Sequence, residues 1–137
     1  MLLHVIMIGL GIVTFSDPPS GSIVSDFKDT INATTLTCNV SNVSTGHQIA
    51  SRWTVKDFRN VSGYEVVTQI ASDLLQVDGD PDIFTNTPGA KFDNRLMILN
   101  FTSELDGEIL YCGTEANPEE ANFILRLYCM LAIMDFI

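Results

Sequence analysis

The stretch ATTLTCNV, residues 33–40, alternates polar and apolar side chains along most of its length. Successive side chains of an extended chain point to opposite sides, so Leu36, Cys38 and Val40 share one face. The threonines between them and Asn39 share the other face. A period of two predicts a β-strand that is buried on one side and exposed to solvent on the other.

Similar short runs recur along the chain, separated by turn residues. They are GSIVSDF (21–27), IASRWTVK (49–56), YEVVTQIA (64–71), LLQV (74–77), RLMILNF (95–101), GEILYCG (107–113) and ANFILRLY (121–128). Long amphipathic helical patterns are absent from the sequence. Strands at this spacing favour an all-β fold, an antiparallel sandwich of two sheets. A length of 137 residues fits a single domain.

The charge balance is strongly acidic. Seventeen acidic residues stand against seven basic ones, which gives a formal net charge of −10. The basic residues are scattered, whereas a phosphate-binding surface needs clustered Lys and Arg. We therefore expect no nucleic-acid partner.

The first sixteen residues, MLLHVIMIGLGIVTFS, carry no Asp, Glu, Lys or Arg. Thr14 and Ser16 are small residues before a possible cleavage point at Asp17. The segment resembles a secretory signal peptide, and a buried N-terminal element is the alternative. It is shorter than the roughly 20 residues of a membrane-spanning helix. We expect a signal peptide at 1–16, one domain at 17–128 and a short apolar tail at 129–137.

Five glycosylation sequons also indicate the secretory compartment. The pattern Asn-x-Ser/Thr, which marks N-glycosylation acceptors, occurs at Asn32, Asn39, Asn42, Asn60 and Asn100. We expect a glycoprotein that is secreted or lies on the extracellular side of the plasma membrane. Its cysteines would then meet an oxidising environment.

Three residues suggest a family. Cys38, Trp53 and Cys112 occur in that order on three predicted strands, and a run from Asp106 leads into the last of them. This combination resembles the immunoglobulin family. The long segment after Trp53 leaves room for C′ and C″ strands, so the domain is similar to the variable-like set. The resemblance implies a Greek-key sandwich, and a sandwich outside this family is the alternative.

The resemblance also implies a disulfide between Cys38 and Cys112 that links the two sheets under the Trp53 ring. Leu36 and Leu110 would then belong to the core. A bond between Cys112 and Cys129 is the alternative. Under the first pairing Cys129 is an unpaired thiol just after the last predicted strand, available for an intermolecular disulfide.

Residues for catalysis or cofactor binding are scarce. His47 is the only histidine outside the predicted signal peptide, and no Ser-His-Asp or Cys-His pattern accompanies it. No cluster of Cys and His predicts a metal site. The acidic loop Asp78-Gly-Asp-Pro-Asp82 fails the EF-hand template, so a solvated turn is favoured over a calcium site. We expect neither enzymatic activity nor a cofactor.

The sequons would place glycans mainly on one sheet, which leaves the other sheet for binding. Outward positions on that sheet are Arg52, Thr54, Lys56, Ile109 and Tyr111. In the family's terms this is the G-F-C-C′ face. We expect a non-enzymatic recognition or adhesion module that binds a protein partner or a second copy of itself. A secreted structural spacer, or a truncated fragment of a larger cell-surface receptor, is the alternative.

Overall fold

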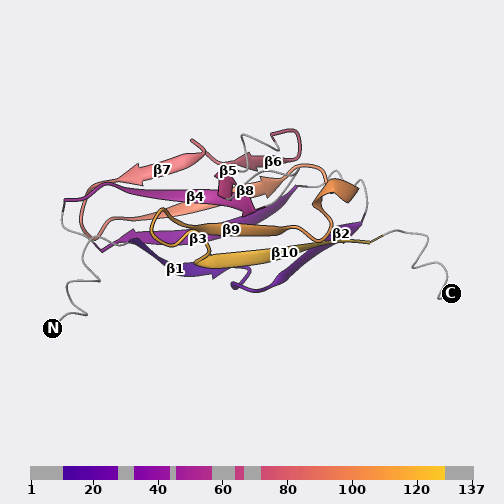
Figure 1. The fold of residues 1–137 in the computed structure, drawn as a ribbon, viewed down its shortest axis with the longest axis horizontal. Helices are drawn as coiled ribbons and strands as arrows, with labels where there is room; N and C mark the ends of the chain where they lie inside the picture. Colours follow the sequence, from indigo (N-terminus) through magenta and orange to yellow (C-terminus); the bar gives the residue numbers. More distant parts are fainter. Residues whose placement is uncertain (1–10, 28–32, 44–45, 57–63, 67–71, 129–137) are drawn as a thin grey trace.

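The computed structural model describes residues 11–27, 33–43, 46–56, 64–66 and 72–128 (Figure 1). Two β-sheets make up the fold. One sheet has the strand order β1-β3-β8-β6 and the other the order β2-β10-β9-β4-β5, with β7 also paired to β4. Their bounds are β1 (Gly11–Asp17), β2 (Ile23–Phe27), β3 (Thr34–Asn42), β4 (Ile49–Lys56), β5 (Tyr64–Val66), β6 (Leu75–Val77), β7 (Asp82–Thr85), β8 (Lys91–Ile98), β9 (Ile109–Thr114) and β10 (Ala121–Tyr128). The chain is therefore an all-β sandwich.

All the strand pairs are antiparallel except that of β2 with β10. One turn of 3₁₀ helix, Ser103–Leu105, connects β8 to β9 and buries Leu105. Gly107 then adopts a φ of 82°, a left-handed conformation that glycine accepts without steric cost. This turn leads the chain from one sheet to the other.

The strands form where the sequence alternates. Leu36, Cys38 and Val40 of β3 are fully buried, as the period of two predicts. On the facing sheet, Leu110 and Trp53 are also fully buried. Inward side chains of both sheets therefore interdigitate into one core.

An aromatic pair lies at the centre of this core. The ring centroids of Trp53 on β4 and Phe123 on β10 are 5.6 Å apart, and the rings are tilted by 38°. Both side chains are fully buried. Such tilted pairs add about 0.5–1.5 kcal/mol to the free energy of burial.

The segment between β4 and β8 supplies strands to both sheets. Within the run 64–71, the structure describes β5 on one part of the β4 edge, and residues 67–71 lie outside the described ranges. The LLQV run supplies β6, which joins the opposite sheet beside β8. The chain then returns to the β4 edge as β7, where Ala50 pairs with Phe84.

The structure also bears on residues 11–16, which the sequence assigns to a signal peptide. They form most of β1, which pairs with β3 from Gly11 opposite Asn42 to Asp17 opposite Thr37. A Cβ atom on Gly11 would lie 2.6 Å from Cγ2 of Ile49, so a larger residue there would require the Ile49 side chain to shift. Cleavage before Asp17 would remove this strand, and the signal peptide stays a prediction. Within the described ranges, no helix is long and apolar enough to cross a membrane.

Candidate functional site

The two cysteines expected to pair lie on opposite sheets at the centre of the core. Cys38 and Cys112 are fully buried, and the structure has them as free thiols whose side chains interact. Burial raises the pKa of the Cys112 thiol, and the hydrogen bond with Cys38 raises it further. A buried thiol with a raised pKa is a poor nucleophile. The disulfide stays a prediction, and Cys129 lies outside the described residues.

A polar pair beside these cysteines was not predicted. Nδ2 of Asn94 donates a hydrogen bond to Oγ of Ser51 over 3.0 Å, and both residues are fully buried. Oδ1 of Asn94 is buried and has no hydrogen-bond partner. The signal was present in the sequence, because Asn94 shares the inward register of Leu96 and Ile98 on β8. The two sheets are therefore joined by a polar contact within an apolar core.

Two carboxylates of the acidic loop at 78–82 lie near arginine side chains. Asp82 Oδ1 lies 3.3 Å from Arg52 Nε, and Asp78 Oδ2 lies 3.6 Å from Arg95 Nη1. Two of the three carboxylates therefore form ion pairs with arginines, and the pair of Asp78 is largely exposed to solvent. Among the described residues, no group of three or more His, Cys, Asp or Glu side chains could hold a metal ion. His47 is exposed, in the segment that leads into β4.

Two residues of the predicted binding face prove less accessible than expected. Thr54 is only 3% exposed, and it pairs in register with Tyr111 on β9 and Val66 on β5. The expectation that Thr54 lies on an open surface is therefore wrong, because it lies on a strand that is paired with β9 on one side and β5 on the other. Arg52 forms the ion pair with Asp82. Its guanidinium group therefore already has a carboxylate partner within the chain.

The accessible part of this sheet lies nearer to β10 and β2. On β9, Ile109 and Tyr111 are half-buried on the outward side. Lys56 is exposed, but it lies at the end of β4. Ile109 pairs in register with Ile124 on β10, and Ile124 pairs with Ile23 on β2. These three residues, the isoleucine row, cross three neighbouring strands on one outward face. Ile23 is 62% exposed.

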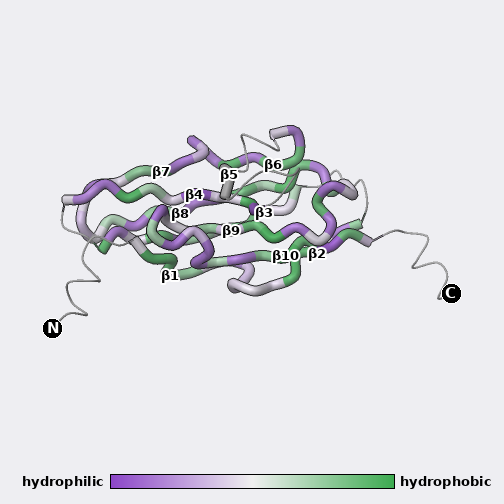
Figure 2. Tube along the Cα trace, viewed as in Figure 1, coloured by the Kyte–Doolittle hydropathy of each residue, from purple (hydrophilic) through white to green (hydrophobic). Residues whose placement is uncertain are grey.

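Two aromatic side chains extend this surface. Phe27 on β2 and Tyr128 on β10 pair in register and are 38% and 52% exposed. Both occupy alternate positions on the same outward side of the sheet as the isoleucine row. Figure 2 shows hydrophobic segments on β9, β10 and β2, which run side by side. The apolar face comprises Ile23, Phe27, Ile109, Ile124 and Tyr128.

The predicted glycosylation sites differ in accessibility. Asn39 is half-buried on the outward side of β3, where its Oδ1 accepts a 2.7 Å hydrogen bond from Thr14 Oγ1. Its Nδ2 donates to Asp93 Oδ1 over 2.9 Å. Asn100 is also half-buried, after the end of β8. Attachment of a glycan at Asn39 would replace one exposed hydrogen bond.

Asn42 is different because it is only 1% exposed. Its Nδ2, the atom that would carry the glycan, lies within hydrogen-bonding distance of the backbone oxygens of His47 (3.3 Å) and Thr85 (3.4 Å). This burial argues against Asn42 as an acceptor in the folded chain. Asn32 and Asn60 lie outside the described residues.

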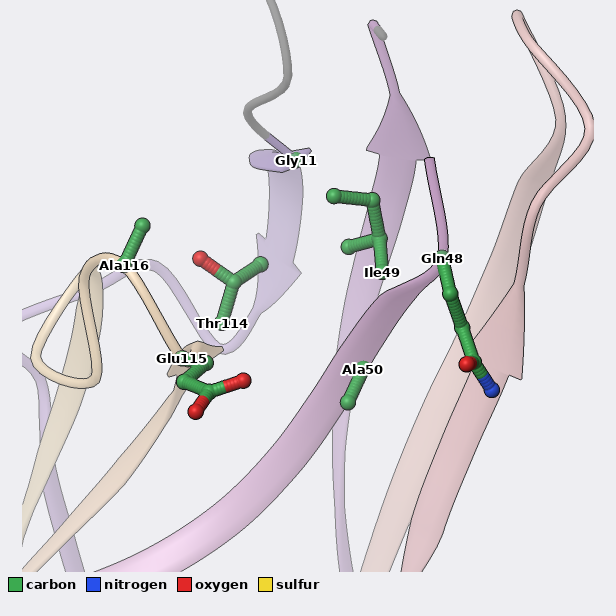
Figure 3. Close-up of a pocket in the computed structure, with 7 residues that line it drawn as sticks. All are labelled: Gly11, Gln48, Ile49, Ala50, Thr114, Glu115 and Ala116. Atoms are coloured by element: carbon green, nitrogen blue, oxygen red, sulfur yellow. The ribbon is translucent and has the colours of Figure 1, made fainter. Parts of the chain in front are cut away.

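A pocket of about 280 Å³ opens at one end of the sandwich (Figure 3). It is lined by Gly11, Gln48, Ile49, Ala50, Thr114, Glu115 and Ala116. These residues come from the start of β1, the start of β4 and the end of β9. The sequence did not predict this pocket, because it is assembled from three segments that are far apart in the chain.

Comparisons with known proteins identify no relative: no protein-family model matches the chain, and no curated protein matches it.

Proposed function

We propose that this chain is an extracellular immunoglobulin-like recognition module, of the variable-like set, that binds a protein partner through the apolar face. The observation that carries the proposal is the isoleucine row, with Phe27 and Tyr128 beside it, on the outward side of β9, β10 and β2. The module would act by surface complementarity and perform no chemistry.

The apolar face would gain free energy from being covered by a partner. Each Å² of apolar surface removed from water contributes about 25 cal/mol. Contiguous exposed apolar patches mark interaction sites more often than single exposed residues do. Here Ile23 and Tyr128 are both more than half exposed, on adjacent strands. The exposed polar pair of Ser25 and Arg126 lies between the isoleucine row and the two aromatic side chains. A spacer domain has no need for such a surface, so recognition is favoured over a structural role.

The immunoglobulin-like assignment is supported by the placement of three residues. Cys38 and Cys112 lie on strands of opposite sheets, and Trp53 pairs in register with Cys112. All three are fully buried. This is the arrangement that the family's disulfide requires, since the bridge must cross between two stacked sheets. The return of β7 to the β4 edge fits a variable-like domain with extra strands on that side.

An enzymatic role has less support. The most nucleophilic side-chain type in the described residues, the thiol of Cys112, is fully buried. An extracellular location is supported by the number of sequons, of which Asn39 and Asn100 are half-buried in the structure. Oxidation of the buried cysteines would be consistent with that compartment.

The proposal is tested by removing apolar contacts without disturbing the core. Ile109→Ser and Ile124→Ser both shorten half-buried, outward side chains. Val43→Ser is the matched control, because Val43 is 44% exposed after the end of the opposite strand β3. Binding of the fluorescently labelled chain to cells is measured by flow cytometry, and self-association by sedimentation velocity.

We expect each isoleucine variant to weaken binding about five- to thirty-fold, the range of an interface residue worth 1–2 kcal/mol. Val43→Ser should bind as the parent chain does. Circular dichroism of each variant controls for folding. Unchanged binding by a folded Ile109→Ser/Ile124→Ser double variant would rule out this face.

A further inference from the structure

The pocket at the end of the sandwich has the chemistry of a site for a basic side chain. Its single charged lining residue is Glu115, which directly follows β9. Figure 3 shows the Glu115 carboxylate directed into the space between β9 and β4, toward Ala50. Glu115 is exposed, so a cation that enters from solvent can reach its carboxylate.

The apolar walls complement this charge. Ile49 and Ala50 are buried at the start of β4. Gly11 of β1 also lines the pocket, and all the other lining residues lie outside residues 1–16, so they remain if the predicted signal peptide is cleaved. Thr114 adds a methyl group to these walls, and its hydroxyl accepts a hydrogen bond from the backbone N–H of Asn117. Lys and Arg have an apolar stem and a charged head, and they bury the stem while the head stays polar. The pocket offers both kinds of surface.

Its size limits the ligand. A volume of about 280 Å³ is below the roughly 300–1,000 Å³ of pockets that hold drug-sized molecules and cofactors. A single side chain is a better match than a cofactor.

Nothing in the described part of the chain supplies the cation. The basic residues there are Arg52, Lys56, Lys91, Arg95 and Arg126, and none of them lines the pocket. Two further carboxylates, Glu119 and Glu120, follow in the same β9–β10 connection and make its potential more negative. The ion pairs of Arg52 and Arg95 are with aspartates elsewhere.

We propose that this pocket, the Glu115 pocket, binds a lysine or arginine side chain of a protein partner. The stem lies against Ile49 and Ala50, and the charged head meets the Glu115 carboxylate. That the side chain belongs to a protein rests on the proposed recognition function, whereas the preference for an alkyl-linked cation rests on the pocket alone.

The experiment is a titration of the ¹⁵N-labelled chain, followed by amide chemical shifts. The probes are the methyl esters of Nα-acetyl-lysine and Nα-acetyl-arginine. Nα-acetyl-norleucine methyl ester, which has the stem without the charge, and calcium chloride, which has the charge without the stem, are the comparisons. We expect the two basic esters to shift the amides of residues 48–50 and 114–116 with dissociation constants on the order of millimolar.

Glu115→Gln should weaken binding of the basic esters about two- to five-fold, as expected for a partly exposed ion pair. Glu119→Gln is the matched control, since Glu119 is exposed on the same connection and does not line the pocket. It should bind as the parent chain does. Equal binding of the norleucine ester, equal shifts with calcium, no shifts with either basic ester, or an unchanged Glu115→Gln would each overturn the proposal. The Ile109→Ser and Ile124→Ser variants should leave these titrations unchanged, so failure here is distinguishable from failure of the apolar face.

Discussion

Shortening Phe123 tests the core on which the apolar face is built. Phe123 is fully buried, and its ring centroid lies 5.6 Å from that of Trp53. Truncation to alanine would cost about 3–5 kcal/mol, through lost burial and the cavity left behind. A domain is commonly stable by only about 5–15 kcal/mol, so this variant is at risk of unfolding. Phe123→Leu is the better choice, with an expected cost of about 1–2 kcal/mol from the lost ring pair and the small change in volume.

The assay uses the only tryptophan of the chain. Trp53 is fully buried, so its fluorescence should shift to longer wavelength as urea unfolds the sandwich. Phe84→Leu is the matched control, because Phe84 is 53% exposed on β7 and should change the free energy of unfolding by less than about 0.5 kcal/mol. Equal unfolding free energies for the two variants would refute the packing described for β4 and β10. So would a Trp53 emission that is already solvent-like before urea is added.

Three further predictions concern the cysteines, the glycans and pH. By mass spectrometry, the chain produced in an oxidising compartment should be two hydrogens lighter than the reduced chain. The bond between Cys38 and Cys112 should add about 4 kcal/mol to the free energy of unfolding. If Cys38 and Cys112 are both free thiols after denaturation, the predicted disulfide is wrong. On a denaturing gel, Asn39→Gln should remove one glycan from the secreted chain. Asn42→Gln should leave the number of glycans unchanged but lower the melting temperature, because the Asn42 amide is buried. The loss of a glycan in Asn42→Gln would show that Asn42 is accessible. Burial raises the pKa of Glu120, so its stabilising contribution is complete below its ordinary pKa of 4.5 and is lost as the pH rises through the folded value. The free energy of unfolding of Glu120→Gln, measured with urea, should therefore equal that of the parent at about pH 4. At about pH 7 it should be higher than that of the parent by less than about 1 kcal/mol. Equal free energies of unfolding at both pH values would contradict the effect.

The alternation of the sequence predicted those parts of the fold that depend on local pattern. On β3 it placed Leu36 and Cys38 inward, because the period of two reports which side of a strand meets the core. It could not place β7, since the residues after the acidic loop show no pattern that distinguishes pairing with β4 from a turn. That pairing depends on a contact of long sequence separation, between Arg52 and Asp82 among others.

The site residues that the sequence did not predict also depend on contacts between distant strands. Alternation assigned Thr54 correctly to the outward side of β4, but outward is not the same as exposed in a central strand. Ile23 and Ile124 were not singled out, because their significance depends on β2 and β10 lying side by side. A parallel pair of strands from opposite ends of the chain leaves no signal in the sequence between them. A prediction of the surface needs the strand order as well as the period.

The apolar face and the Glu115 pocket are related through β9. Ile109 begins this strand and Thr114 ends it, so the isoleucine row and the pocket are separated by about 17 Å, at roughly 3.4 Å per residue. A partner that buries about 800 Å² on one side spans a region about 28 Å across. The isoleucine row and the pocket therefore fall within the footprint of one ordinary interface. The pocket opens at the end of the sandwich while the row lies on its outer face, so one partner would have to reach around the end of β9. A basic side chain on an extended loop of the partner is the element best suited to that reach.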